Sequence, residues 1–348
     1  MKITFIARYF PDDMKGGGEF HIYELWKRTK QDYNVSLISG WKNNPNLLPE
    51  NTYPIKMTKN KWVNYIKFYF KTKKYLKQIK PDIIFSSCPE IPLPTKSVVL
   101  VPHFGHWLHL KKLNPLEKLQ RYFYVNKMKK YNRILVSSKA TKKDLEQMGL
   151  IVHNISYPGP NKDYKPLKHK NKFFTITYAS RFSKEKGQHI AIESIKLLPR
   201  NIQNKIKLIL VGFLNDQEYF SELKKQAKDL PVEFHTNVES TIPFFQKTDI
   251  MIFPTLMYEG FGMVAAEALA CEKPVIASDY PAIREAVDKF GLYFEPGNAK
   301  QLSEHIQNLY QNNKLRTQLG KQGRKYVLEN FSWKKRYKEL KEIFESLK

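Results

Sequence analysis

Short apolar runs rich in β-branched residues alternate with amphipathic stretches along nearly the whole chain. This alternation predicts parallel sheets covered by crossover helices, and therefore an α/β fold. The first predicted helix covers residues 18–30. The first series of predicted strands comprises residues 2–8, 34–40, 81–87, 97–102 and 133–138. The second series comprises residues 173–180, 205–212, 232–236, 249–255, 274–278 and 291–296.

Residues 157–172 separate the two series and are rich in Pro, Lys and Asn without apolar periodicity, which predicts a linker. We therefore expect two Rossmann-like domains, an N-terminal one over residues 1–165 and a C-terminal one over residues 166–330. Residues 331–348 are expected to form a helix that packs back on the N-terminal domain. Ligands of open α/β sheets bind beyond the carboxyl ends of the strands. The expected site is therefore a cleft across which the two parallel sheets face each other.

The composition is that of a globular protein, with 42% hydrophobic and 14% aromatic residues. No apolar run is long enough to span a membrane, and residues 2–7 are too short for a signal peptide. Only Cys88 and Cys271 are present, both in segments predicted to be interior, so neither a disulfide nor a zinc framework is expected. These features favour a reducing cytoplasm as the location.

The formal net charge is +26, from 59 Lys and Arg against 33 Asp and Glu. This charge favours an anionic partner, which is nucleic acid, anionic lipid or a phosphorylated substrate. The alternative is that an AT-rich genome has enriched the chain in lysine and that many of these lysines are simply solvated. Composition alone leaves both interpretations open.

A Gly-Phe-Gly turn at residues 260–262 falls between a predicted strand and a predicted helix that begins near Met263. Glycines let backbone N–H groups approach a ligand, and a helix N-terminus favours a phosphate or a partly negative oxygen. Glu267 follows in an otherwise apolar helix, where an unpaired carboxylate is costly. Either a buried cation pairs with it, or the vicinal hydroxyls of a ligand such as a ribose satisfy it. The position of Glu259 directly before the turn favours a ligand.

The stretch EGFGMVAAEALACEKPVIAS (259–278) resembles the signature of the retaining GT-B glycosyltransferases of family 4, in which two glutamates are separated by seven residues. The resemblance implies that Glu267 binds the ribose of a nucleotide-sugar. It also implies that hydroxyls of the donor hexose contact Glu259 and the backbone of Gly260, Phe261, Gly262 and Met263. Glu272 departs from the family, which usually has Gly there, at the far end of the helix from the site.

A second match is YASRFSKEKGQHIAIESI (178–195), in which Arg181 and Lys186 precede a predicted helix. Two cations beside a helix N-terminus suit a diphosphate. The resemblance implies that they neutralise the donor phosphates and the leaving nucleoside diphosphate. Ala179 and Ser180 stand where the family usually has Gly before the Arg. The alternative is that both cations are solvated loop charges.

Gly16, Gly17 and Gly18 stand at the start of the first predicted helix, in neither a Walker nor a dinucleotide-binding pattern, so ATP and NAD are not supported. In the family such a glycine loop lies across the cleft from the donor, which implies that Gly17 and Gly18 are donor-binding. A tight turn alone also requires glycine.

Three histidines, His103, His106 and His109, are spaced by three residues. They suit one helical face and a metal, but no fourth ligand is evident and the family needs no metal, so none is expected. The resemblance implies that His103 is the family's cleft histidine near the reacting centre, with His106 as the alternative. Phe104 replaces the family's usual Asp. A structural role for all three histidines is the remaining alternative.

The expected function is a retaining, metal-independent hexosyltransferase without a cofactor, with His103, Arg181, Lys186 and Glu259 as catalytic residues. The resemblance favours front-face substitution, since no carboxylate in the matched segments is available as a nucleophile. A UDP-sugar is the favoured donor and a GDP-sugar the alternative. The acceptor is a hydroxyl of a glycan or lipid-linked molecule in polysaccharide, lipopolysaccharide or glycolipid synthesis. The alternatives are a GT-B nucleotide-sugar epimerase and a non-enzymatic nucleic-acid-binding protein.

Residues 61–80 and 116–131 combine aromatic residues with lysines. The first stretch sets Trp62, Tyr65, Tyr69, Leu76 and Ile79 on one helical stripe and Lys67, Lys71 and Lys74 on another face. Such helices suit the surface of an anionic bilayer, which predicts peripheral attachment to the inner face of the cell membrane. The alternative is that the aromatic residues pack on the N-terminal sheet and the lysines are solvated.

Overall fold

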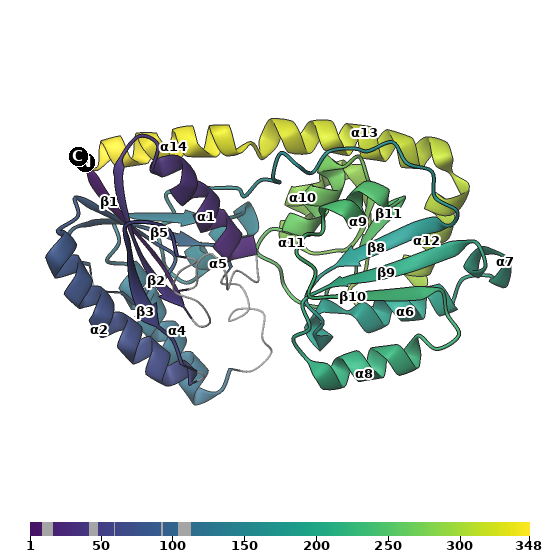
Figure 1. Ribbon diagram of the computed structural model, residues 1–348, viewed down its shortest axis with the longest axis horizontal. Helices are drawn as coiled ribbons and strands as arrows, with labels where there is room; N and C mark the ends of the chain where they lie inside the picture. The colour runs from purple at the N-terminus through teal and green to yellow at the C-terminus, as the bar shows by residue number, and fades with distance from the viewer. Residues whose placement is uncertain (9–16, 42–47, 59, 92, 104–112) are drawn as a thin grey trace. The chain divides into compact units, whose positions relative to one another are not determined.

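A computed structural model describes residues 1–8, 17–41, 48–58, 60–91, 93–103 and 113–348 of the chain (Figure 1). The chain divides into two compact units, one formed by Met1–Pro158 with Trp333–Lys348 and the other by Gly159–Ser332. The first division therefore falls inside the expected linker, and the terminal helix belongs to the N-terminal unit. Among the described residues, no helix is both long enough and apolar enough to cross a membrane.

The N-terminal unit is built on a parallel sheet with strand order β3-β2-β1-β4-β5-β6-β7. Its strands are β1 (Lys2–Ala7), β2 (Asn34–Trp41), β3 (Thr52–Lys56), β4 (Ile83–Ser86), β5 (Lys96–Val101), β6 (Arg133–Val136) and β7 (Asn154–Ile155). Its helices are α1 (Gly17–Thr29), α2 (Lys61–Ile79), α4 (Pro115–Met128), α5 (Lys139–Gln147) and α14 (Trp333–Ser346).

Alternation along the strands builds a separate apolar core on each face of this sheet. In β1, Ile3 and Phe5 belong to one core and Ile6 to the other. Helices α2, α4 and α5 contribute to the Ile6 core, whereas α1 and α14 cover Ile3 and Phe5. Successive side chains of a strand point to opposite faces of the sheet. Both faces are therefore apolar and covered by helices, which gives three layers.

The C-terminal unit has a parallel sheet with strand order β10-β9-β8-β11-β12-β13. Its strands are β8 (Phe174–Ala179), β9 (Ile206–Gly212), β10 (Val232–Thr236), β11 (Ile250–Phe253), β12 (Val275–Ser278) and β13 (Gly291–Phe294). Its α-helices are α6 (Gln188–Lys196), α7 (Arg200–Gln203), α8 (Gln217–Gln226), α9 (Ile242–Lys247), α10 (Met263–Ala270), α11 (Pro281–Val287), α12 (Ala299–Gln311) and α13 (Asn313–Asn330). Two 3₁₀ turns are η2 (Lys184–Lys186) and η3 (Asp288–Phe290). The strand order reverses between β8 and β11, which is the topological switch point where such sheets bind ligands.

Every predicted strand is found, whereas β3 and β7 were not predicted. Strand β3 lies at the edge of the sheet and contains Pro54, which is tolerated there because an edge strand leaves one row of N–H groups unpaired. Strand β7, at the other edge, has only two residues. Neither strand carries the apolar run on which the predictions were based.

The stripe predicted along α2 is divided between two environments. Leu76 is buried and Tyr65, Tyr69 and Ile79 are partly buried, whereas Trp62 is 55% exposed. Helices α2 and α4 lie side by side, with the Lys127 ammonium 5.7 Å from the ring centroid of Tyr69 (Figure 1). We define the α2–α4 surface by the exposed apolar residues Trp62, Val63, Ile66, Phe70, Leu119, Tyr122 and Phe123 and the exposed lysines Lys71, Lys73, Lys74, Lys77, Lys118, Lys129 and Lys130.

Candidate functional site

Two loops meet at the carboxyl edge of the C-terminal sheet, one after β8 and one after β11. The backbone N–H of Leu256 donates to the carbonyl oxygen of Glu185 at 2.9 Å, which ties the β11 loop to the 3₁₀ turn η2. Gly187 makes this approach feasible, with φ of 72° and no side chain. A Cβ at Gly187 would stand 2.0 Å from the carbonyl oxygen of Pro254. Only glycine therefore fits where the two loops touch.

The loops bring together two of the predicted residues, Lys186 and Glu259. The Lys186 Nζ lies 2.6 Å from Glu259 Oε1, and the two side chains are only 12% and 16% exposed. The Thr255 hydroxyl also donates to Glu259 Oε1, at 3.3 Å. The Tyr178 hydroxyl donates to the Lys186 carbonyl oxygen at 2.6 Å, which fixes the backbone of the turn. The pair is thus held from both loops, and its ammonium keeps further N–H donors for a second anion.

Arg181 lies in the same loop, two residues after the buried end of β8. Phe182 is fully buried and packs on Phe220 with ring centroids 5.0 Å apart, which anchors the loop. The Gln188 side chain donates to the Arg181 carbonyl oxygen at 2.6 Å. The Arg181 side chain remains partly exposed and forms no ion pair with any residue that the structure describes. A guanidinium placed this way can donate hydrogen bonds to a phosphate without first breaking an ion pair within the described part of the chain.

The predicted Gly-Phe-Gly turn leads directly into α10. Gly262 has φ of 103°, and its carbonyl oxygen accepts from the N–H of Ala265 at 3.0 Å. A Cβ at Gly262 would make only ordinary contacts, so its conformation rather than space requires glycine there. Phe261 is buried and packs edge-on against Phe331, with ring centroids 4.9 Å apart. Met263 is the first residue of α10, so the predicted turn and the helix N-terminus coincide.

Glu267 lies in the middle of α10, where the residue is partly exposed but its carboxyl group is crowded by protein atoms. This burial raises the pKa of the Glu267 carboxyl to about 8, and the influence of the Tyr164 hydroxyl on that pKa is in the opposite direction. The predicted alternative of a buried cation is not observed among the described residues, since Glu267 forms no ion pair with them. Tyr164 was missed by the sequence analysis because it lies in the linker, where no periodicity marks it.

Three of the predicted site residues, Gly17, Gly18 and His103, belong to the N-terminal unit. Gly17 begins α1, and a Cβ at Gly18 would lie 3.0 Å from the Cγ of Pro102. The glycines therefore allow the first turn of α1 to approach Pro102, which directly follows β5, and His103 is the next residue along the chain. Gly16, Phe104, His106 and His109 lie outside the described residues. Within the described ranges, no three His, Cys, Asp or Glu side chains lie close enough to share a metal ion.

An ion pair that the sequence analysis did not single out lies at the carboxyl edge of the N-terminal sheet. Arg8, directly after β1, pairs with Glu90, which follows β4. The Arg8 guanidinium also lies over the Tyr65 ring, 4.0 Å from its centroid, and this contact joins the edge of the sheet to α2. Neither charge belongs to a local motif, so only the topology brings them together.

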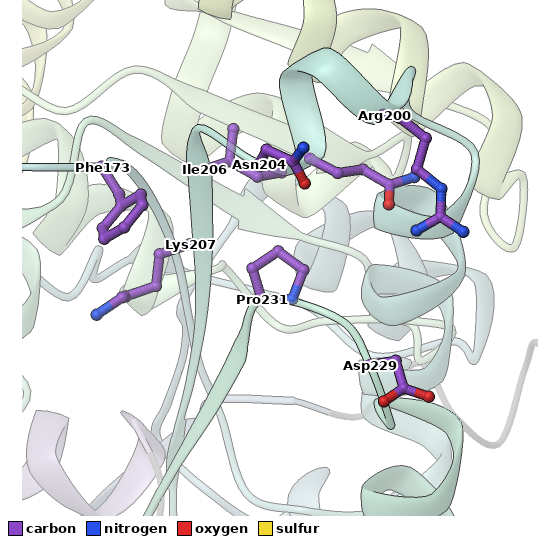
Figure 2. Close-up of a pocket in the computed structure, with 8 residues that line it drawn as sticks. Phe173, Arg200, Asn204, Ile206, Lys207, Asp229 and Pro231 are labelled. Atoms are coloured by element: carbon purple, nitrogen blue, oxygen red, sulfur yellow. The ribbon is translucent and has the colours of Figure 1, made fainter.

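A hollow of about 260 Å³ lies at the opposite edge of the C-terminal sheet (Figure 2). Phe173 precedes β8, Ile206 begins β9 and Pro231 precedes β10, so the hollow is at the amino ends of these strands. Lys186 and Glu259 follow the carboxyl ends of strands in the same sheet. The hollow is therefore separate from the candidate site.

Two family models match the chain. Residues 161–326 match the model for glycosyl transferases group 1, and residues 15–156 match the model for glycosyltransferase family 4. The matched ranges correspond to the two units of the structure.

Curated relatives cover the chain to different extents. An uncharacterized glycosyltransferase of Methanocaldococcus jannaschii is 27% identical over 362 residues, covering 100% of this chain and 99% of the relative. The capsular polysaccharide biosynthesis glycosyltransferase CapM of Staphylococcus aureus is 29% identical over 61% of this chain and 58% of its own length. The crystal structure of Anabaena HepE in complex with UDP and glucose superposes with a TM-score of 0.83 at 17% identity, over 99% of this chain and 100% of HepE. This likeness confirms the predicted GT-B fold.

Proposed function

Because this chain is a glycosyltransferase of the GT-B fold, we propose that it transfers a hexose from a nucleotide-sugar to a hydroxyl of a glycan or lipid-linked acceptor with retention of configuration. A UDP-sugar is the favoured donor, because HepE is described in complex with UDP and glucose, and a GDP-sugar is the alternative. The name of CapM supports a place in cell-surface polysaccharide synthesis, alongside lipopolysaccharide or glycolipid synthesis.

The observation that carries the proposal is the pairing of Lys186 with Glu259 where two loops meet at the carboxyl edge of the sheet. Lys186 and Arg181 bind the donor diphosphate, while Glu259 and the backbone from Gly260 to Met263 bind the hexose. Glu267 binds the ribose. An ammonium has three donors, so Lys186 binds a phosphate oxygen while it keeps Glu259 in place.

The proposed chemistry is front-face substitution. The bond between the anomeric carbon and the diphosphate breaks, and the acceptor oxygen bonds to the same face of that carbon. The acceptor proton passes to an oxygen of the leaving diphosphate. The contacts of Glu259 with Lys186 and Thr255 make it unsuited to act as a nucleophile. Lys186 and Arg181 stabilise the leaving group without a metal or other cofactor, because preorganised charges stabilise the negative charge that develops in a transition state. His103 is proposed to act near the reacting centre, with Gly17 and Gly18 on the donor side of the N-terminal unit.

The charge and the α2–α4 surface support a second part of the proposal. Exposed aromatic residues and lysines share this surface, and α2 carries no acidic residue. Aromatic side chains partition into the interface of a bilayer and lysines are attracted to anionic headgroups. We propose that this surface holds the enzyme on the cytoplasmic face of the membrane, near a lipid-linked acceptor.

Ligand-induced stabilisation and product stereochemistry test the donor assignment. UDP, GDP and their sugars are added to the full chain and to Glu267→Ala, with Glu272→Ala, five residues further on, as a matched control. A bound nucleotide raises the melting temperature of the wild type and of Glu272→Ala, and much less that of Glu267→Ala. The anomeric configuration of the product, followed by NMR with a donor that binds, must match that of the donor. The donor assignment is wrong if no nucleotide raises the melting temperature.

A further inference from the structure

Gln188 closes the loop that carries both cations of the candidate site. Its side-chain amide donates to the Arg181 carbonyl oxygen at 2.6 Å, across seven positions of the chain. The segment between these two residues contains the 3₁₀ turn η2 and therefore Lys186. Arg181 and Lys186 thus belong to one closed loop, whose ends are joined by a side-chain hydrogen bond.

The Gln188 end of this loop is fixed against the β11 loop. Gly187, directly before it, lies so close to Pro254 that a Cβ at Gly187 would stand 2.0 Å from the Pro254 carbonyl oxygen. Gln188 itself is the first residue of α6 and is only 1% exposed. The Tyr178 hydroxyl of β8 donates to the Lys186 carbonyl oxygen at 2.6 Å. The backbone from Lys186 to Gln188 is therefore held in place before any ligand binds.

The Arg181 end of the loop is held beside a different strand. The N–H of Phe182 donates to the carbonyl oxygen of Phe213, just after β9, at 2.8 Å. This N–H and the Arg181 carbonyl belong to one peptide group, which is thus held from β9 on one side and by Gln188 on the other. The Gln188 bond therefore joins the two ends of the loop and fixes the spacing between Arg181 and Lys186.

Folding stability alone does not account for this glutamine. The Gln188 Oε1 is buried without a hydrogen-bond partner among the residues that the structure describes. An unpaired buried polar atom costs at least as much as one typical hydrogen bond contributes, so the two sides of this amide largely offset each other. Gln203, another buried glutamine of the same unit, instead donates to two carbonyl oxygens, those of Lys196 at 3.1 Å and Leu198 at 2.7 Å. The difference indicates that Gln188 serves the loop rather than the core.

We propose that Gln188 is a positioning residue, which holds Arg181 at the spacing from Lys186 that a diphosphate requires. This inference rests on the proposed role of the two cations in donor binding and adds a residue to which that proposal gives no part. The two phosphates of a diphosphate lie at a fixed separation, so cations preorganised at that separation bind them with less loss of conformational freedom. Without the Gln188 amide, Arg181 keeps its charge but has to be ordered by the ligand.

Binding to the full chain tests the inference, with UDP or GDP, the matching nucleoside, and inorganic pyrophosphate as probes. Calorimetry suits the nucleotides and ligand-observed NMR the weaker ligands. Gln188→Met keeps the length of the side chain but removes the amide. It is expected to weaken binding of the nucleotide and of pyrophosphate roughly five- to tenfold, the effect of about one hydrogen bond, and to leave the nucleoside affinity unchanged. A purely structural role for Gln188 would affect the nucleoside as well.

Gln203→Met is the matched control, because it removes the amide of a second buried glutamine, which lines the hollow at the opposite edge of the sheet. It is expected to leave every affinity unchanged and to lower the melting temperature more than Gln188→Met does, since it removes two hydrogen bonds rather than one. Should Gln188→Met fail to fold, Gln188→Asn, whose amide is too short to reach Arg181, carries the same expectations.

The double variant Gln188→Met with Arg181→Ala shows whether Gln188 acts through Arg181. If it does, Gln188→Met has little further effect on nucleotide affinity once Arg181 is replaced. Equal losses in both backgrounds, or equal losses for nucleotide and nucleoside, would overturn the inference while leaving the proposed function intact.

Pyrophosphate distinguishes a failure of the inference from a failure of the proposed donor. If neither UDP nor GDP binds the wild type but pyrophosphate does, and Gln188→Met weakens it, the donor is wrong and the role of Gln188 stands. If Gln188→Met binds pyrophosphate as tightly as the wild type, the inference is wrong whether or not a nucleotide binds. If none of the three binds the wild type, both are wrong.

Discussion

In the C-terminal unit the candidate site lies on two loops at the carboxyl edge of the sheet, where Lys186 and Glu259 are mostly buried. In the N-terminal unit the α2–α4 surface lies on two outer helices, where Trp62 and Phe70 are 55% and 62% exposed. The large apolar residues exposed on the C-terminal unit, such as Leu197 and Leu328, are on separate elements. One doubly wound architecture thus presents a compact polar site in one unit and a broad apolar and basic surface in the other. The difference fits the proposed function, in which one unit binds an anionic donor and the other lies at a membrane near the acceptor.

The largest effect is expected when a charge is removed from the compact polar site of the C-terminal unit. Lys186→Ala removes the cation from the proposed diphosphate site and leaves Glu259 without its ion-pair partner. We expect kcat/KM for transfer to fall about 100- to 1000-fold, as when a preorganised electrostatic group is lost. Lys184→Ala, an exposed lysine of the same 3₁₀ turn, is the control and is expected to retain most activity. Similar losses in both variants would mean that general charge, rather than the pair, matters.

Two glycines with nearly the same φ test whether the loops of the compact site are more constrained than those of the N-terminal unit. Gly187 has φ of 72° and Gly149 has φ of 75°, but a Cβ meets backbone only at Gly187 and has open space at Gly149. Gly149→Ala is expected to destabilise its unit by about 1 kcal/mol through conformation alone. Gly187→Ala adds a clash with Pro254 and is expected to cost about 3 kcal/mol or more and to reduce activity. Calorimetric melting measures both, and equal shifts would contradict the close approach of the two loops.

The α2–α4 surface is tested by vesicle sedimentation. Trp62→Ser with Phe70→Ser is expected to weaken binding to vesicles containing anionic phospholipid on the order of tenfold or more, because burial of each aromatic side chain contributes about 1.5–3 kcal/mol when complete. Binding is also expected to weaken with salt, since the lysines of this surface are screened. Leu197→Ser with Leu328→Ser on the C-terminal unit is the matched control. An equal effect of the two double variants would show that exposed apolar residues act without regard to their unit.

The two units are expected to respond to pH in opposite directions. Burial raises the pKa of Glu267 to about 8 from 4.5, so its contribution to folding stability is complete below pH 4.5 and is lost as pH rises towards 8. Burial lowers the pKa of His21, in the N-terminal unit, to about 3 from 6.5, so its contribution is present above pH 6.5 and is lost as pH falls towards 3. Each slope reaches about 1.4 kcal/mol per pH unit.

Calorimetry across pH checks this difference in two variants. Glu267→Gln is expected to flatten the alkaline side of the stability profile and His21→Gln the acidic side. If both variants flatten the same side, the assignment of the two buried groups is wrong.

Local patterns in the sequence were enough to predict the two parallel sheets, because every buried strand carries an apolar run of its own. They also predicted the turn at Gly262 and the position of Glu267, since each belongs to a contiguous motif. The contact of Lys186 with Glu259 joins residues 73 positions apart and depends on how the loops pack. Tyr164 and the Arg8–Glu90 pair have no local motif, so only the folded chain reveals them. At Glu272 the sequence departs from the family, but the backbone keeps a positive φ of 60°, the conformation that glycine adopts at lowest cost.

The membership of α14 in the N-terminal unit has a consequence for how the chain is made. Gly159–Ser332 is continuous, so the ribosome delivers all of the C-terminal unit before it delivers Trp333. Until Leu340 and Phe344 emerge, Ile3 and Phe5 lack part of their apolar cover. The half of the protein that is translated first is therefore the half that is completed last, and during that interval its uncovered face is open to chaperones and to aggregation.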